Sequence, residues 1–329
     1  MEKTRRAFLT SAAKGIAGVG LAATLPAYLW AAQKVSAYKL ALSQFSLASE
    51  FWTKQLDPLD FAAKTKSYGI TGLDYCSMFF ATKAKDEAFL AELKKRAADN
   101  GCYNLRIMVD SEEMLGSLKT EERSKAVENH YKWIDAAATL GCPMIRVNIE
   151  GDGDPNEVAK AAAESLTTLI EYGRKGNVDI TVENHVGISC NGAWLAALMK
   201  KLNNSHVGVL ADFGNFCVNR TKPVTNDIAG WMGTKCLEEY DRYKGIEELM
   251  PYAKGVHAKT RLFGENGNDT ETDFKKMFSI IRKSGYLGWI SVEYEGGLMK
   301  MYGKDAKYLD DSAGIMATKE LIEKVEAAV

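Results

Sequence analysis

The sequence lacks several features that would assign it to common functional classes. Its six cysteines form no CxxC pair, which excludes a zinc ribbon or a thioredoxin-like redox motif. It has no basic tract and a formal charge of −1, which argues against a nucleic-acid surface. It also has no internal repeat, low-complexity tract or linker between domains. These absences favour a globular protein whose partner is a neutral or weakly charged small molecule.

The N-terminal residues have the pattern of an export signal. The stretch TRRAFLTS (4–11) contains paired arginines, and an uncharged, weakly apolar stretch follows over 15–32. This pattern predicts a Tat-type signal segment over 1–32 and a periplasmic or otherwise exported protein. A retained anchor is the alternative, but the glycines, alanines and Pro26 make a poor membrane span, so we expect no stable membrane insertion after processing. The Tat route carries folded proteins that often hold a cofactor already.

Eight apolar, β-rich runs alternate with eight helical patterns over the remaining ~295 residues. This count is the one that a closed parallel barrel requires, so we predict an α/β fold, a single-domain (β/α)₈ TIM barrel, over 33–329. The predicted strands are 39–45, 70–75, 103–109, 143–149, 179–185, 207–215, 253–260 and 289–296, and the predicted helices lie near 57–68, 86–100, 120–140, 155–175, 191–203, 244–251, 272–284 and 305–326.

Glycines mark several of the predicted helix ends. Gly69, Gly101, Gly141 and Gly176 each follow a helical pattern and precede a strand, as a left-handed helix cap does. One segment breaks the alternation: residues 216–243 form an insertion loop after the sixth strand. Loops that follow barrel strands lie on the catalytic face, so this one is either a lid or substrate wall or a structural flap.

Four acidic or imidazole side chains stand just past the ends of the last four apolar, β-rich runs: Glu183, Asp212, His257 and Glu293. The carboxyl ends of barrel strands share one face, so these side chains should converge. Three crowded carboxylates repel one another unless a cation lies between them. Three carboxylates and one imidazole make a hard, oxygen-rich site, which favours one divalent metal, with Mn²⁺ first and Mg²⁺ or Co²⁺ as alternatives. Two adjacent oxygens of a sugar would complete an octahedral ion.

The chain resembles the xylose isomerase-like TIM-barrel superfamily of sugar isomerases and epimerases. The resemblance is strongest in ENH (183–185), DFGN (212–215), VHAK (256–259) and VEYEG (292–296). It implies that the four residues bind one divalent metal and that the two glutamates, Glu183 and Glu293, also act as the catalytic acid and base. Asn215 departs from the pattern, because family epimerases often carry a histidine there, which puts 3-epimerisation of free ketoses in doubt. An apurinic endonuclease shares the fold but needs more histidines than the four present.

The pattern therefore predicts a metal-dependent sugar isomerase or epimerase that removes a proton beside a carbonyl through an enediolate. A lyase or hydratase acting on 3-keto sugars or glycosides is the runner-up, because it begins with the same proton abstraction. A non-catalytic periplasmic sugar-binding protein is the third interpretation. Barrels of this kind commonly pair, so a homo-oligomer is one expectation.

Further side chains are candidates for substrate binding, and each also has a plain structural interpretation. His185 follows Glu183 closely, and Glu150 follows the fourth strand. Asp74 and Arg106 are expected to form a buried ion pair that orients the barrel rim. The predicted substrate-binding residues are His185, Lys259, Arg261, Glu150, Asn215 and Trp52, the last stacking on a sugar face together with Phe45.

Overall fold

The computed structural model describes residues 38–329 except 113, 226 and 304–306. The predicted signal segment, residues 1–32, lies outside the described residues. None of the helices in the described part of the chain combines the length and the hydropathy that crossing a membrane requires.

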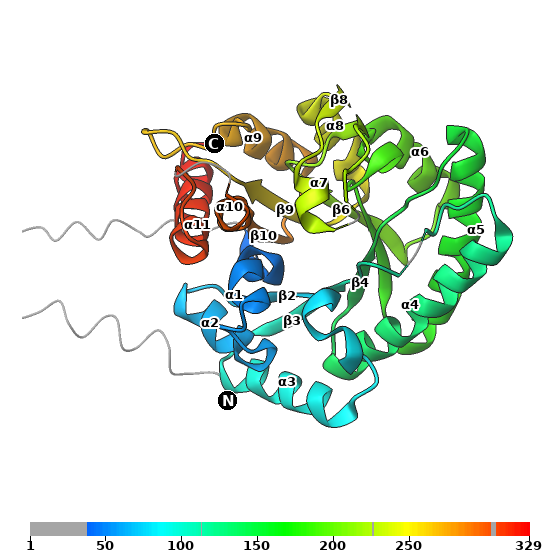
Figure 1. The fold of residues 1–329 in the computed structure, drawn as a ribbon, viewed down its shortest axis with the longest axis horizontal. Helices are drawn as coiled ribbons and strands as arrows, with labels where there is room; N and C mark the ends of the chain where they lie inside the picture. Colours follow the sequence, from blue (N-terminus) through cyan, green and yellow to red (C-terminus); the bar gives the residue numbers. More distant parts are fainter. Residues whose placement is uncertain (1–37, 113, 226, 304–306) are drawn as a thin grey trace, which may run out of the picture. The chain divides into compact units, whose positions relative to one another are not determined.

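Eight parallel strands close into a barrel inside a ring of helices (Figure 1). The order around the barrel is β1-β10-β9-β6-β5-β4-β3-β2, which confirms the predicted TIM barrel and the position of each predicted strand. The strands are β1 (Lys39–Ser43), β2 (Gly72–Cys76), β3 (Tyr103–Met108), β4 (Met144–Val147), β5 (Asp179–Glu183), β6 (Val207–Asp212), β9 (Ala253–Thr260) and β10 (Trp289–Tyr294).

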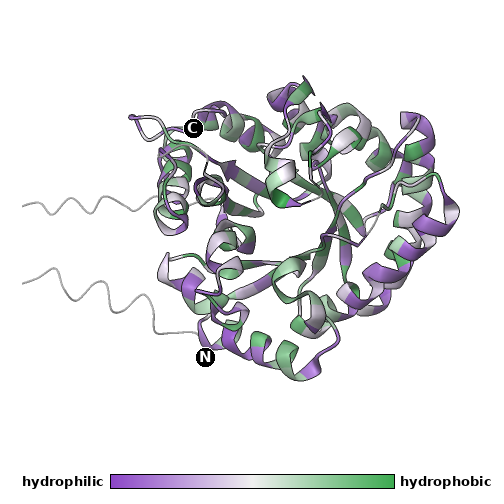
Figure 2. Ribbon diagram, in the orientation of Figure 1, coloured by the Kyte–Doolittle hydropathy of each residue, from purple (hydrophilic) through white to green (hydrophobic). Residues whose placement is uncertain are grey.

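The helices that follow these strands form the outer layer. In Figure 2 hydrophilic residues lie mostly on the outer sides of the helices and hydrophobic ones face the strands, as amphipathic helices around a barrel require. The helices are α1 (Ala48–Trp52), α2 (Phe61–Ser67), α3 (Glu87–Asp99), α4 (Thr120–Leu140), α5 (Pro155–Gly173), α6 (Gly192–Leu202), α7 (Ile228–Met232), α8 (Arg242–Leu249), α9 (Phe274–Ser284), α10 (Gly296–Met301) and α11 (Asp311–Ala328).

The predicted left-handed glycine caps are confirmed at three of the four positions. Gly69, Gly101 and Gly141 have positive φ angles of 72°, 63° and 81°. The prediction for Gly176 is wrong, because a short 3₁₀ turn extends the helix and Asn177 takes the left-handed conformation with φ 53°. Asparagine tolerates this region better than other side chains do, so the turn shifts by one residue.

Alternation along the strands sends polar side chains into the barrel. In β9 and β10 the buried residues His257, Lys259, Ser291 and Glu293 alternate with apolar residues that join the hydrophobic core around the barrel. Successive strand residues point to opposite faces, so one face of each strand packs against helices while the other lines the barrel interior. The interior therefore holds several buried polar groups.

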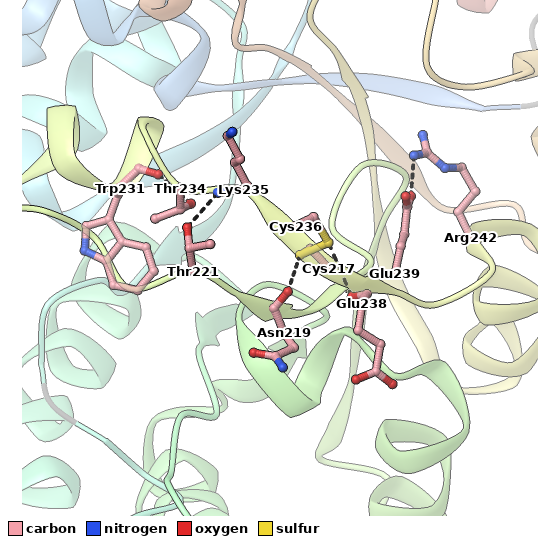
Figure 3. Close-up of a disulfide and its surroundings, with 10 residues drawn as sticks. All are labelled: Cys217, Asn219, Thr221, Trp231, Thr234, Lys235, Cys236, Glu238, Glu239 and Arg242. Carbon is pink, nitrogen blue, oxygen red and sulfur yellow. Dashed lines mark hydrogen bonds and ion pairs between the residues drawn. A yellow bond between two sulfur atoms is a disulfide. The ribbon is translucent and has the colours of Figure 1, made fainter.

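The insertion at 216–243 has structure of its own. Strands β7 (Cys217–Arg220) and β8 (Cys236–Glu239) form an antiparallel hairpin that carries α7 between them, and a disulfide joins Cys217 to Cys236 (Figure 3). The spacing of the cysteines alone could not predict this pairing. The hairpin begins five residues after Asp212, so it is anchored beside the barrel mouth.

Stability is expected to depend on pH through a buried acid at the start of α11. Asp311 is 4% exposed and accepts a hydrogen bond from Ser49 Oγ. Burial raises the pKa of Asp311 to about 6, whereas an unfolded aspartate titrates near pH 3.9. The folded protein thus binds this proton more tightly than the unfolded chain does. The stabilisation from the protonated form is complete below about pH 4 and is lost as the pH rises through 6.

Between pH 4 and pH 7, the unfolding free energy of the wild type should therefore fall by about 2 kcal/mol relative to that of Asp311→Asn. Urea unfolding at a series of pH values measures the difference. The exposed residue Asp99 offers a control, because Asp99→Asn should leave the wild-type pH dependence intact. If the unfolding free energies of the wild type and of Asp311→Asn change with pH in the same way, the prediction is contradicted.

Candidate metal centre

Four strands bring the predicted ligand residues together inside the barrel. Glu183 and Asp212 are the last residues of β5 and β6, whereas His257 and Glu293 lie one to three residues before the ends of β9 and β10. Strand pairing places Asp212 beside His257. All four are buried, with exposures of 4% or less. The sequence analysis placed these residues just past the strand ends, but they belong to the strands, whose backbone bonding fixes their direction.

One ligand atom from each residue lies within 4.8 Å of those of the other three. The imidazole sits centrally, since its Nδ1 atom lies 3.2 Å from Glu293 Oε2, 3.4 Å from Glu183 Oε1 and 3.8 Å from Asp212 Oδ2. A cation that touches four ligands needs donor atoms about this far apart, because each metal–oxygen bond is roughly 2.2 Å long. The convergence that the sequence predicted is therefore present.

Each of the four side chains also has one buried atom without a hydrogen-bond partner. The atoms are Glu183 Oε2, Asp212 Oδ2, His257 Nδ1 and Glu293 Oε2. The first of them is ion-paired with Arg146, and Glu183 turns its other oxygen, Oε1, toward His257. Buried polar atoms in folded proteins nearly always have a partner, so a set of unsatisfied atoms gathered in one place indicates a missing ligand. The atoms are three carboxylate oxygens and one imidazole nitrogen, which are donors to a cation.

Arg146 on β4 contacts Glu183 and was missed by the sequence analysis. Its Nε atom lies 2.8 Å from Glu183 Oε2, and its Nη1 atom donates to Asp110 Oδ1 over 2.6 Å. Asn148 Nδ2 donates to the same Asp110 oxygen over 3.0 Å. Burial alone would raise the pKa of Glu183, but Arg146 and His257 together lower it to about 2. Glu183 is therefore held ionised and ready to bind a cation.

Asp74 fixes the orientation of His257. Asp74 Oδ2 lies 3.3 Å from His257 Nε2 and accepts a hydrogen bond from Ser291 Oγ, while Oδ1 accepts one from Arg106 Nε over 2.9 Å. The predicted Asp74–Arg106 ion pair is confirmed, and both residues are fully buried. A carboxylate on Nε2 turns Nδ1 toward the other ligand atoms, which is how metal-binding histidines are usually held.

The remaining two ligands are held by hydrogen bonds from neighbouring strands. The backbone N–H of Gly214 donates to Asp212 Oδ1 over 2.7 Å, and the side chain of Asn184 bonds to both the N–H and the C=O of Asp212. Ser43 Oγ on β1 donates to Glu293 Oε1 over 2.8 Å. Each carboxylate therefore has one oxygen engaged by the protein and one facing the cluster, so the ligand atoms are fixed in place before an ion arrives.

Ion pairs connect the four side chains to further charged groups in one network. The buried part of this network has six carboxylates and four side chains that are always cationic. Glu271, which pairs with Arg261 but is half-exposed, is not counted. The network therefore holds more negative than positive charge, and unpaired charges are costly to bury. Burial, and repulsion from Glu293 and Glu183, raise the pKa of Asp212 well above its usual range, so a proton would relieve the excess where no cation does. The network consists of Asp74, Asp110, Glu183, Asp212, Glu293, Glu295, Arg106, Arg146, Lys259 and Arg261.

Two of the predicted substrate-binding residues have a polar side-chain atom that makes no hydrogen bond. His185 Nδ1 and Asn215 Nδ2 are buried and have no hydrogen-bond partner. Gln44, which the sequence analysis did not single out, has the same property: its Oε1 atom accepts from the N–H of Cys76, and its Nε2 atom is unsatisfied. Gln44 directly follows β1, so its place at the strand end was the available signal. These groups are suited to bind hydroxyl groups of a ligand.

Trp52 belongs to a small aromatic wall formed with Phe45 and Phe79. The Trp52 ring lies edge-on to both partners at centroid distances of 5.9 Å and 5.8 Å, and all three side chains are partly exposed. Phe45 follows β1 and Phe79 follows β2, so the wall stands on the same end of the barrel as the cluster. Glu150 is partly exposed beyond β4, and burial together with Asp110 raises its pKa.

Lys259 and Arg261 are engaged by acidic side chains of the protein. Lys259 Nζ lies 2.8 Å from Glu295 Oε1, and Arg261 Nη2 lies 2.8 Å from Glu295 Oε2. Glu295 was missed by the sequence analysis, although it stands in the VEYEG motif two residues after Glu293. Contact of Lys259 or Arg261 with a substrate stays a prediction.

The fold and the buried cluster define the protein as a TIM barrel with a candidate metal centre. The profile of the xylose isomerase-like TIM barrel family matches residues 62–316, and the chain belongs to this family. No curated protein matches the chain in sequence.

Similar solved structures include several sugar epimerases. A 3-keto-D-glucoside 4-epimerase from E. coli aligns with a TM-score of 0.61 at 13% identity, covering 87% of this chain and 99% of that protein. An L-ribulose 3-epimerase aligns with a TM-score of 0.63 at 16% identity, covering 88% and 95%. A D-psicose 3-epimerase aligns with a TM-score of 0.60 at 14% identity, covering 88% and 97%. At these identities the likeness establishes the shared fold.

Proposed function

We propose that the protein is a sugar isomerase or epimerase that depends on one divalent metal, with Mn²⁺ first and Mg²⁺ or Co²⁺ as alternatives. Glu183, Asp212, His257 and Glu293 would hold the ion. The observation that carries the proposal is that each of these four buried residues brings one ligand atom within 4.8 Å of those of the other three, while Asp212 Oδ2, His257 Nδ1 and Glu293 Oε2 make no hydrogen bond. The charge excess of the surrounding network supports a divalent cation, and the epimerase activities of the similar structures support a sugar substrate.

The two glutamates are suited to move a proton. They come from β5 and β10, and an oxygen of each lies close to His257 Nδ1, at 3.4 Å for Glu183 and 3.2 Å for Glu293. Glu293 accepts a hydrogen bond from the hydroxyl of Ser43 on Oε1 and pairs with Lys259 on Oε2, which keeps it in the ionised form that can take up a proton. We assign to it the proton of the carbon beside the carbonyl. Glu183 would act from the other face, as inversion of a carbon requires. A bound metal would supply polarisation of the carbonyl and stabilisation of the enediolate charge.

Other groups at the barrel mouth would orient the sugar. The unsatisfied donors of His185, Asn215 and Gln44 would bind hydroxyl oxygens. Trp52 with Phe45 would stack against the apolar face of a ring. Glu150, with its raised pKa, would share a proton with a hydroxyl group at the rim.

A lyase or hydratase acting on 3-keto sugars or glycosides is the second candidate. It would use the same proton abstraction and then expel the group on the adjacent carbon. The aromatic wall of Trp52, Phe45 and Phe79 favours it, because an apolar leaving group could pack there. One of the similar solved structures is a 3-keto-D-glucoside 4-epimerase, whose name gives a keto-glucoside as its substrate.

Solvent deuterium exchange tests the proposal. Manganese-loaded protein in D₂O would be incubated with ketoses and with 3-keto-glycosides, and the products followed by NMR. Deuterium at a carbon beside the carbonyl is expected; a changed configuration there indicates an epimerase, and release of the aglycone indicates a lyase. Tight sugar binding without exchange into any sugar of the panel would instead support the non-catalytic binding protein.

We also propose that the protein is exported by the Tat route. The paired arginines Arg5 and Arg6 support this route, and the Cys217–Cys236 disulfide supports an oxidising compartment. Replacing both arginines by lysine should retain the protein in the cytoplasm. Unchanged export, measured by cell fractionation, would contradict the route.

A further inference from the structure

A lysine side chain lies beside the position that the metal ion would take. Lys259 stands two residues after His257 on β9, so both side chains point into the barrel. Its Nζ atom lies 3.0 Å from Glu293 Oε2 and 3.5 Å from Asp212 Oδ2. These two oxygens are among the four unsatisfied ligand atoms. The ammonium thus contacts the very atoms that a cation needs.

The surroundings hold this ammonium from its outer side. Glu295 Oε1 lies 2.8 Å from Nζ, and Asn215 Oδ1 accepts a hydrogen bond from it over 3.3 Å. The side chain of Lys259 runs along Gly214, where a Cβ atom would come within 2.8 Å of the lysine Cδ. The lysine is 4% exposed, so water does not screen its charge from the carboxylates. Lys259 can therefore remain in place, shifted slightly toward Glu295, when an ion binds.

We infer that Lys259 competes with the metal for Glu293 and Asp212 and so lowers the affinity of the centre for its ion. This inference rests on the proposed metal-dependent function. Two positive charges a few ångströms apart in a buried site repel by several kcal/mol even at an effective dielectric constant near 20. Beside a bound ion, the same ammonium provides a second positive group for the substrate oxygen that gains negative charge during proton abstraction. Lys259 thus lowers the affinity of the centre for its metal and at the same time supplies a second positive charge for the substrate.

Calorimetric titration with Mn²⁺ tests the inference on the full chain. Lys259→Met keeps the aliphatic stem and removes the charge, and we expect its Kd for Mn²⁺ to be at least tenfold lower than that of the wild type. Deuterium exchange into the substrate should fall at least tenfold in the same variant. Tighter metal binding with slower exchange separates this role from a folding defect, which would weaken both. Lys254→Met is the matched control, because Lys254 lies at the other end of β9 against Asp179, and both values should stay within twofold of the wild type.

A second variant changes the partner of the Lys259 ammonium instead of the lysine itself. Glu295→Gln removes the carboxylate that holds the ammonium outward, so Mn²⁺ should bind at least threefold more weakly; this measurement decides the matter if Lys259→Met does not fold. The inference is overturned if the Kd for Mn²⁺ is unchanged or higher in Lys259→Met, or unchanged or lower in Glu295→Gln. Binding of Mn²⁺ by the wild type would in that case still support the metal centre. If neither the wild type nor Lys259→Met binds Mn²⁺, the proposed function itself fails.

Discussion

Replacing Glu293 by glutamine is expected to slow deuterium exchange into the substrate by about a thousandfold, within the range that general bases contribute. The single oxygen of the glutamine amide can still face the ion, with its NH₂ group toward the hydroxyl of Ser43, which can turn to accept a hydrogen bond, but the amide cannot take up a proton at neutral pH. Mn²⁺ should therefore still bind, more weakly, and the sugar should still bind. NMR exchange rates at saturating Mn²⁺ measure the loss.

Two further variants test the roles assigned to the two glutamates. Glu183→Gln should lose stereochemical inversion, since its carboxylate is assigned to the other face of the substrate. Glu164→Gln is the control, because that glutamate is 69% exposed and far from the cluster in its pairing with Arg123. Exchange at the wild-type rate in Glu293→Gln would contradict the assignment of this residue as the base.

Arg106→Leu should cost the protein about 3–5 kcal/mol of unfolding free energy. The substitution leaves the fully buried carboxylate of Asp74 without its cationic partner. The double variant Asp74→Leu with Arg106→Leu should recover most of that loss, because an apolar pair can replace a buried ion pair at little cost. Urea unfolding of the two variants and the wild type measures both effects.

The double variant should nevertheless bind Mn²⁺ roughly 10–100-fold more weakly than the wild type, because it removes the acceptor that orients His257. Recovered stability together with recovered metal affinity would show that Asp74 has no part in holding the ligand. A matched control is Asp179→Asn, which disrupts an ion pair outside the barrel mouth and should leave the affinity for Mn²⁺ unchanged.

The sequence was sufficient to predict the barrel and the four converging residues for a physical reason. Strand periodicity shows where each strand ends, and the topology of a closed parallel barrel then places those ends on one face. The cores of most strands were predicted correctly because β-branched and apolar residues fill them, and the predicted range of β9 matched although its sequence, AKGVHAKT, alternates small or apolar residues with polar ones. Boundaries failed where a turn could form in more than one way, as at Asn177 instead of Gly176.

The groups that hold the ligands were harder to predict. Arg146 and Ser43 lie far in sequence from the ligands that they contact, and their pairing depends on register and side-chain direction rather than on any local motif. Glu295 stands in the VEYEG motif, but its contact with Lys259 depends on the register of β9 and β10. The pairing of Cys217 with Cys236 likewise depends on a hairpin inside the insertion, which has no strong strand periodicity. Asp74 and Arg106 were predictable as a pair because they lie on neighbouring strands, but the contact of Asp74 with His257 crosses the barrel.

The most direct test of the metal centre is titration of chelator-treated protein with Mn²⁺, followed by elemental analysis of the desalted complex. The account predicts one ion per chain in the wild type and its loss in Asp212→Asn and in His257→Gln, with all three proteins folded by circular dichroism. A wild-type protein that stays free of metal at saturating Mn²⁺, or variants that still retain one ion per chain, would contradict it.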